Sequence, residues 1–201
     1  MDEDPIQTAF EEWTRGLDPL AARIVLFERV RDIPYQYPAS RDPIEVLRRR
    51  RGSCSGKHYL LGALFHRLGV PLRHMLCTHR FNESPLPFPE EMQAMLRKNE
   101  IVDVHDYLQI QVNHDWIDVD VTWELVLRDF GFPVTESWDG KSSMLLTVIP
   151  DEHIRVEGDP SKAKEELLAK LTPRQRALRK QFLDALGKVV AELTAEIPRE
   201  A

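Results

Sequence analysis

Two runs of alternating residues joined by a short polar turn constrain this 201-residue chain more than any other feature. Between residues 102 and 122, apolar side chains occupy every second position on either side of Asn113-His114-Asp115. Such alternation is typical of a β-strand with one buried face, and two such runs around a polar turn predict an antiparallel hairpin. The apolar positions are Leu108, Ile110 and Val112 before the turn and Ile117, Val119 and Val121 after it.

The register of the predicted hairpin follows from the face on which its apolar residues must lie. Residues directly opposite on antiparallel strands share a face, so both apolar sets are buried only if they match. One set is even-numbered and the other odd-numbered, so paired positions must add to an odd number, which a turn of even length around Asn113 and His114 supplies. The same parity places His105 and Asp120 together on the opposite face.

Cys54 is predicted to begin a helix. A Gly-Ser pair interrupts the preceding pattern, and apolar residues then recur at helical spacing until Gly69. A helix N-terminus favours a thiolate, a nearby imidazole can take the thiol proton, and a carboxylate can orient the imidazole. Cys54, His105 and Asp120 are therefore candidates for thiol catalysis. Taken singly, they have ordinary explanations as a buried thiol, a strand-edge histidine and a solvated carboxylate.

The remaining patterns predict helices at both ends of the chain and strands between them, which is an α+β architecture. Asp18-Pro19 and Asp42-Pro43 mark helix starts, the second with Glu45 completing a capping box. Other predicted elements are strands at 72–78 and 143–149, a surface loop at 81–89 and a polar helix at 90–98. We divide the chain into a domain of residues 1–157 and a helical extension of residues 158–201. The extension is expected to pack as a helical hairpin, on the core or on a second subunit.

Composition excludes several classes of protein. The 27 Lys and Arg against 33 Asp and Glu give a net charge of −6, so nucleic acid is not expected as a partner. The apolar runs are too short for a membrane span, and the acidic start at Asp2 and Glu3 is unlike a secretory signal, which predicts a cytoplasmic location. Two cysteines, Cys54 and Cys77, cannot form a disulfide framework. The arginine run 48–51 is interpreted as the solvated end of a helix, with binding of acidic groups as the alternative.

Several stretches of the chain resemble the transglutaminase-like superfamily. Residues 27–35, 46–54 and 60–71 are similar to the first helix of that family, the segment that leads to its nucleophile, and the helix that ends in Gly-Ile-Pro. His105 with its strand, and the block Trp116-Ile-Asp-Val-Asp-Val-Thr122, resemble the family's histidine and its Trp-x-x-x-Asp-x-Thr motif. A valine stands where the family commonly has proline before the threonine.

The resemblance implies a papain-like α+β fold over residues 20–150. It implies acyl transfer with Cys54 as nucleophile, His105 as general base and acid, and Asp120 as the residue that orients the histidine. Hydrolysis of a peptide or amide substrate through an acyl-thioester is implied more often than transfer to an amine, and no cofactor or metal is expected. The chain has no acidic calcium loop, so calcium dependence is not expected. The alternatives are a catalytically idle scaffold and an interaction protein that forms homo-oligomers through its C-terminal helices.

Aromatic and polar residues around the predicted site are candidates for substrate binding. Tyr35 and Gln36 are candidates by position, including for an oxyanion hole, and Trp116 is a candidate for lining a substrate groove. Trp123 and Trp138 are assigned equally to the groove and to the core.

Two further groups of residues have competing interpretations. Lys57 and His58 follow the nucleophile closely and are interpreted as solvated, with stabilisation of a thiolate as the alternative. A metal site is the main alternative to thiol catalysis. On a strand, however, Cys77 and His79 would share one face while His74 points to the other. The ordinary interpretation is that Cys77 packs in the sheet and His79 lies at its edge. The candidate ligands are His74, Cys77 and His79, with His66 nearby.

Overall fold

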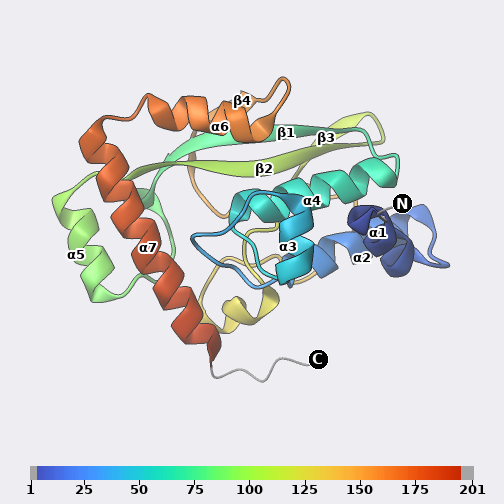
Figure 1. Ribbon diagram of the computed structural model, residues 1–201, viewed down its shortest axis with the longest axis horizontal. Coiled ribbons are helices and arrows are strands. Elements are labelled where there is room, and N and C mark those ends of the chain that lie inside the picture. The colour runs from blue at the N-terminus through green and yellow to red at the C-terminus, as the bar shows by residue number, and fades with distance from the viewer. Residues whose placement is uncertain (1–3, 196–201) are drawn as a thin grey trace.

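A four-stranded antiparallel sheet in the order β3-β2-β1-β4 forms the centre of the fold, with helices packed around it (Figure 1). The computed structural model describes residues 4–195, so Asp2 and Glu3 lie outside the described residues. Helices precede, separate and follow the strands, which confirms the α+β prediction. The strands are β1 (Leu72–Arg80), β2 (Val102–Val112), β3 (Asp115–Val119) and β4 (Pro150–Arg155).

The predicted hairpin of β2 and β3 is confirmed, including its register. Leu108 pairs with Val119, so opposite positions add to an odd number. Both residues of the two-residue turn have positive φ angles, of 50° and 75°, as the commonest hairpin turns require. The register brings His105 to the side of the sheet on which Asp120 follows β3, and the two side chains meet there.

The strand predicted at residues 143–149 is wrong, because β4 begins only at Pro150. Residues 143–149 pass the end of β3 instead. The Met144 N–H donates to the Asp118 carbonyl oxygen at 2.9 Å, but the Thr147 N–H donates to the Asp120 carboxylate at 3.0 Å. A side-chain carboxylate thus takes a hydrogen bond that a regular strand would give to its neighbour.

Three N-terminal helices begin with an aspartate cap followed by proline. They are α1 (Pro5–Thr14), α2 (Pro19–Arg31) and α3 (Pro43–Arg49). Each capping carboxylate accepts a backbone N–H, and proline fits the first helical position because an N–H there would lack a helical partner. The capping box predicted for α3 is only half formed, since Glu45 pairs with two arginines while the Asp42 N–H donates to Ser40 Oγ. The arginine run 48–51 is exposed, which confirms its solvated interpretation.

The helix that begins at Cys54 packs along the sheet. This helix, α4 (Cys54–Arg67), ends before Gly69, whose φ of 74° turns the chain away. Its apolar side meets α2 and one face of the hairpin in the main core, which fixes its first turn relative to β2. The core residues include Leu26, Phe27, Val30, Leu60, Leu61, Leu64, Phe65, Leu108, Ile110 and Val119.

The two C-terminal helices pack on the core at different places (Figure 1). The prediction of packing on the core is confirmed, but the helical hairpin is wrong. α6 (Pro160–Ala169) covers part of β1 and β2, whereas α7 (Pro173–Ala195) packs with α5 (Glu90–Lys98) and the short helices η1 (Phe81–Glu83) and η2 (Leu125–Phe130).

The apolar side of α7 is buried within the chain, through Phe182, Leu183, Leu186 and Val190. The division at residue 157 and a homo-oligomer formed through these helices stay predictions. Within residues 4–195, no helix combines the length and the apolar character that crossing a bilayer requires.

Lys57 is buried, so the prediction that it is solvated is wrong. Its exposed fraction is 0%, and Nζ donates to the carbonyl oxygens of Arg31 at 2.8 Å and Thr122 at 3.0 Å. The ammonium group thereby ties the end of α2 and the segment after β3 to the first turn of α4. Burial lowers the pKa of Lys57 to about 8, although nearby carboxylates such as Glu124 and Asp32 oppose the shift.

Lys57→Met is expected to change the pH dependence of stability. Between about pH 8 and 10.5 the unfolded chain keeps a proton on Lys57 that the folded protein releases, so this group makes stability rise with pH. The variant lacks this contribution. The free energy of unfolding of the wild type relative to the variant should therefore increase across this window, by on the order of 3 kcal/mol. Urea titrations at both ends of the window, with the exposed Lys162→Met as control, measure it; a constant difference would contradict the low pKa.

Candidate active site

Cys54 is the first residue of α4, and its partly exposed side chain borders a cavity. The Ser53 hydroxyl caps the helix by accepting the Gly56 N–H at 3.4 Å. The N–H groups at the very start of a helix have no intrahelical acceptor, so that of Cys54 is available to a ligand. The loop before Cys54 is held by the Gln36 N–H, which donates to the Gly52 carbonyl oxygen at 3.0 Å.

Asp120 accepts five hydrogen bonds through its two buried carboxylate oxygens. Oδ2 lies 2.9 Å from Nε2 of His105 and also accepts the N–H and hydroxyl of Thr147. Oδ1 accepts the N–H and hydroxyl of Thr122. Burial alone would raise the pKa of Asp120, but the charge and hydrogen bond of His105 hold it well below its ordinary value. Asp120 therefore stays ionised and fixes the imidazole ring of His105.

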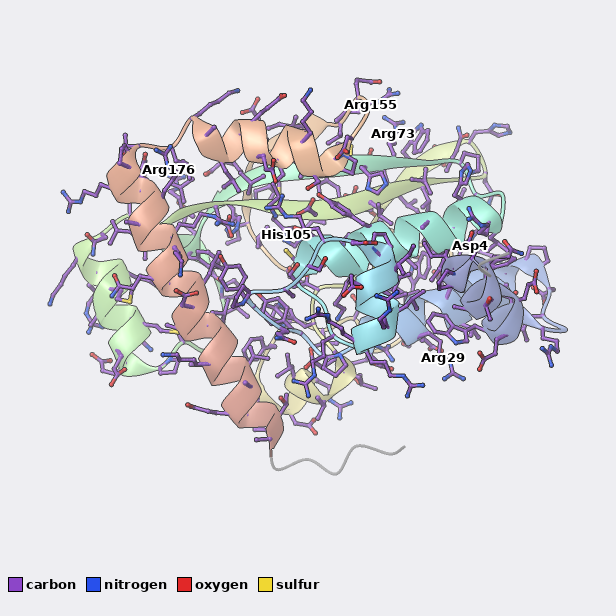
Figure 2. All side chains as sticks on the ribbon, in the orientation of Figure 1. Asp4, Arg29, Arg73, His105, Arg155 and Arg176 are labelled. Carbon is purple, nitrogen blue, oxygen red and sulfur yellow. The ribbon has the colours of Figure 1, made fainter. Side chains whose placement is uncertain are left out.

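His105 lies near the middle of the molecule (Figure 2) and interacts with both Asp120 and Cys54. Because Nε2 is bonded to Asp120, Nδ1 is the ring nitrogen left for Cys54, which lines the same cavity as His105. Burial alone would lower the pKa of His105, but the charges and hydrogen bonds of Asp120 and Cys54 raise it well above the ordinary value. Burial alone would raise the pKa of the Cys54 thiol, but the Lys164 charge and the hydrogen bond and charge of His105 lower it. These shifts favour a thiolate beside an imidazolium.

His58 is a second buried histidine at this site, so its interpretation as solvated is wrong. Its Nδ1 lies 2.8 Å from the Cys54 carbonyl oxygen, and its Nε2 accepts the Val121 N–H at 3.0 Å. The two contacts require the neutral tautomer with the proton on Nδ1. His58 thus joins the first turn of α4 to the segment that carries Asp120. Its spacing of four residues from Cys54, one helical turn, was the available signal.

The ligand atoms of His58, His105 and Asp120 lie within 4.8 Å of one another, close enough to bind a metal ion. The His58 Nε2 lone pair already accepts the Val121 N–H, however, and both Asp120 oxygens already accept several donors. A metal would have to displace these hydrogen bonds. The arrangement suits a hydrogen-bonded chain better than a metal centre.

A cavity of about 230 Å³ adjoins Cys54 and His105. Its lining is mainly apolar, and the C-terminal helices supply part of it, with Lys164 from α6 and Leu183 and Leu186 from α7. An ion pair between Asp103 and Arg179 also borders this space.

Tyr35 and Gln36, both predicted to bind substrate, are placed differently. Tyr35 is buried and lines the cavity. Gln36 does not line it; its side chain is exposed, while its backbone holds the loop before Cys54. Adjacent residues of an extended segment point to opposite sides, which accounts for the difference.

The three tryptophans singled out from the sequence also lie in different environments. Trp116 does not line the cavity: it is 38% exposed on β3, and the Arg73 guanidinium lies 3.4 Å from its ring centroid. Trp123 lines the cavity, whereas Trp138 packs against Phe27 in the main core. Burial of an indole beside the cavity or in the core could not be distinguished from local sequence.

The alternative metal ligands do not form a cluster within the described residues. His74 packs against Tyr59, and Cys77 is buried in the sheet as interpreted. His79 is also buried, which corrects its placement at the sheet edge: β1 is an inner strand, and His79 packs against Phe81.

Three residues that the sequence did not single out lie directly beside the site. Ser55, Asp106 and Lys164 form a buried, hydrogen-bonded cluster. Ser55 follows Cys54 and Asp106 follows His105, and that adjacency was a signal for both. Nothing in the local sequence marks Lys164 among the lysines of the helical tail.

Comparisons with known proteins bear on the fold. No curated protein sequence matches this chain. Among solved structures, it is similar to a candidate cysteine protease from Cytophaga hutchinsonii, with 16% identity and a TM-score of 0.43 over 61% of this chain and 38% of that one. The chain therefore covers well under two thirds of that protein. The model of the transglutaminase-like superfamily matches residues 11–121, which is more than half of the chain and includes Cys54, His105 and Asp120. This chain belongs to the transglutaminase-like superfamily.

Proposed function

We propose that this protein is a cysteine-dependent enzyme that hydrolyses amide or peptide bonds through an acyl-thioester on Cys54. His105 acts as general base and acid, and Asp120 orients it. One observation carries the proposal: His105 is held at 2.9 Å by an ionised, buried Asp120, and its other ring nitrogen is left for a thiol of lowered pKa. Family membership supports a cysteine enzyme in general.

The first half of the proposed reaction forms the thioester. The Cys54 thiolate adds to the substrate carbonyl carbon, and the carbonyl oxygen takes up negative charge. The backbone N–H of Cys54, which begins α4 and so lacks an intrahelical acceptor, donates to that oxygen in the proposed step. The C–N bond then breaks as the His105 imidazolium gives its proton to the leaving nitrogen, so that an amine departs and the acyl group stays on sulfur.

The second half of the reaction releases the acyl group. Water adds to the thioester carbonyl while neutral His105 takes a proton from it, and collapse of the intermediate expels the thiolate and yields a carboxylic acid. The proton on His105 restores the starting ion pair. An amine in place of water would give a new amide by the same steps, which is the transglutaminase reaction.

The Cys54 thiol is expected to be alkylated by iodoacetamide well below pH 8.5, the pKa of an ordinary thiol. The imidazolium of His105 and the Lys164 charge favour the thiolate, so alkylation should stay fast as the pH falls until the thiolate is protonated. Mass spectrometry over pH 4 to 9 distinguishes Cys54 from Cys77, which is buried and whose pKa burial raises to about 11.

The matched control for this experiment is His105→Ala. In that variant Cys54 should lose its reactivity at low pH while Cys77 stays protected as long as the sheet is folded. A wild-type Cys54 that reacts no faster than an ordinary thiol would contradict the proposal and favour an idle scaffold.

A further inference from the structure

Lys164 is a buried cation that α6 carries to the back of the candidate site. Its exposed fraction is 2%. Nζ donates to Asp106 Oδ2 at 2.5 Å and to Ser55 Oγ at 2.9 Å. Asp106 also accepts the Ser55 hydroxyl at 2.6 Å and the Tyr59 hydroxyl at 2.9 Å, so both of its carboxylate oxygens accept hydrogen bonds. A buried ammonium with this set of partners is held in one place.

The partners of Lys164 are the sequence neighbours of the proposed reacting residues. Ser55 directly follows Cys54 at the start of α4, and Asp106 directly follows His105 on β2. By binding both, Lys164 connects the helix that carries the thiol to the strand that carries the imidazole. The apolar face of α6 packs on the sheet through Leu76 and Val104, which fixes the helix that delivers the lysine.

Lys164 also acts on the thiol through its charge. It lines the same cavity as Cys54 and His105, and its ammonium favours the thiolate at Cys54. The Asp106 charge raises the pKa of the Cys54 thiol, and this effect is smaller than the lowering by Lys164. Together, Lys164 and Asp106 therefore favour the negatively charged form of the Cys54 sulfur.

We propose that Lys164 is a positioning residue for Cys54: from α6 it holds Ser55 and Asp106, and it stabilises the thiolate by its charge. This inference rests on the proposed function, because a positioned thiolate is useful only if Cys54 is the nucleophile. It makes the C-terminal helix α6 a part of the active site.

Other ionisable groups surround Cys54 and would contribute to any pH profile. They come from four helices and strands and from the loop at residues 34–36, and none of them is changed by substitution of Lys164. They are Tyr35, Tyr59 on α4, His79 on β1, Asp103, His105 and Asp106 on β2, and Arg179 on α7.

The test compares iodoacetamide alkylation of Cys54 across pH 4 to 9 in the wild type and in Lys164→Met, which keeps the length of the side chain and removes the charge. The midpoint of the profile should move to higher pH in Lys164→Met, with a several-fold lower rate at pH 5. Lys164→Arg should retain most of the low-pH reactivity. The matched control is Lys162→Met, an exposed lysine on the same helix, which should leave the profile unchanged.

A double variant, Lys164→Met with Asp106→Asn, covers the case in which the single variant does not fold. Removing only the lysine leaves a buried carboxylate without its cation, which is strongly destabilising, whereas removing both charges avoids that cost. Alkylation of buried Cys77 reports unfolding in the same samples. The double variant should also show a midpoint above that of the wild type, because Lys164 outweighs Asp106 at Cys54.

The outcomes separate the two hypotheses. A low midpoint in the wild type that stays unchanged in the folded variants would overturn the role of Lys164 and leave the proposed function intact. An ordinary midpoint in the wild type would overturn both, since Lys164 would then stabilise no thiolate. A low wild-type midpoint that rises in the variants supports both.

Discussion

Cys54→Ala is expected to abolish hydrolysis, with a fall in rate of about 10⁴-fold or more. The proposed thioester bond cannot form without the sulfur atom. Cys54→Ser should be similarly inactive, because His105 and Lys164 act on a group that is much harder to deprotonate than a thiol. The fold should survive, since Cys54 is partly exposed at a helix start and belongs to none of the apolar core clusters.

The measurement for this variant is digestion of a mixed library of synthetic peptides, with new termini identified by mass spectrometry. Added hydroxylamine should capture the acyl group as a hydroxamate with the wild type alone, which tests for the thioester. Cys77→Ala is the matched control: it removes the buried thiol and should cost about 1 to 2 kcal/mol of stability while leaving the rate unchanged. Hydrolysis that persists in Cys54→Ala would move the chemistry to another residue, and loss of folding would make Cys54 structural.

Asp120→Asn is expected to lower turnover by about 10³- to 10⁴-fold. All five hydrogen-bond partners of Asp120 act as donors, so an asparagine NH₂ group must face a donor in either orientation. If it faces His105, Nε2 must accept and the ring proton moves to Nδ1, where it blocks transfer from Cys54, while the Thr147 N–H and hydroxyl lose their acceptor. If it faces Thr122, a buried N–H and a hydroxyl lose their acceptor, which costs about 1 to 3 kcal/mol for each group.

Thermal unfolding should show a loss of stability in either orientation, because each leaves one threonine N–H and hydroxyl without an acceptor, whereas turnover reports the tautomer of His105. Asp118→Asn is the matched control, because Asp118 lies on β3 two residues earlier and, within residues 4–195, its carboxylate accepts a hydrogen bond only from the Gln109 side chain. That variant should keep both stability and rate. Wild-type turnover in Asp120→Asn would remove Asp120 from the proposed mechanism.

The parts of the structure that the sequence predicted are those governed by local periodicity. The alternation in β2 and β3 has a period of two residues, so one buried face determined the register and the pairing of Leu108 with Val119. Because paired positions in this register add to an odd number, the same argument placed His105 and Asp120 on one side of the sheet, where their side chains are in contact. Aspartate-proline pairs located α2 and α3 because both residues act within a single turn.

Other features depended on partners distant in sequence. Lys57 looks like a surface cation, but its acceptors are two backbone carbonyl oxygens, which have no sequence signature. Lys164 reaches Ser55 across 109 positions. The strand predicted at 143–149 does not form, because the Thr147 N–H donates to the Asp120 carboxylate instead of to a neighbouring strand.

The order of elements along the chain has a consequence for biosynthesis. A ribosome delivers Cys54, His105 and Asp120 before α6 and α7, the helices that bring Lys164 and close one side of the cavity. A nascent chain that has emerged only as far as β4 therefore carries the three proposed reacting residues while Ser55 and Asp106 still lack their cation. The proposed nucleophile is therefore completed by helices that are translated after it.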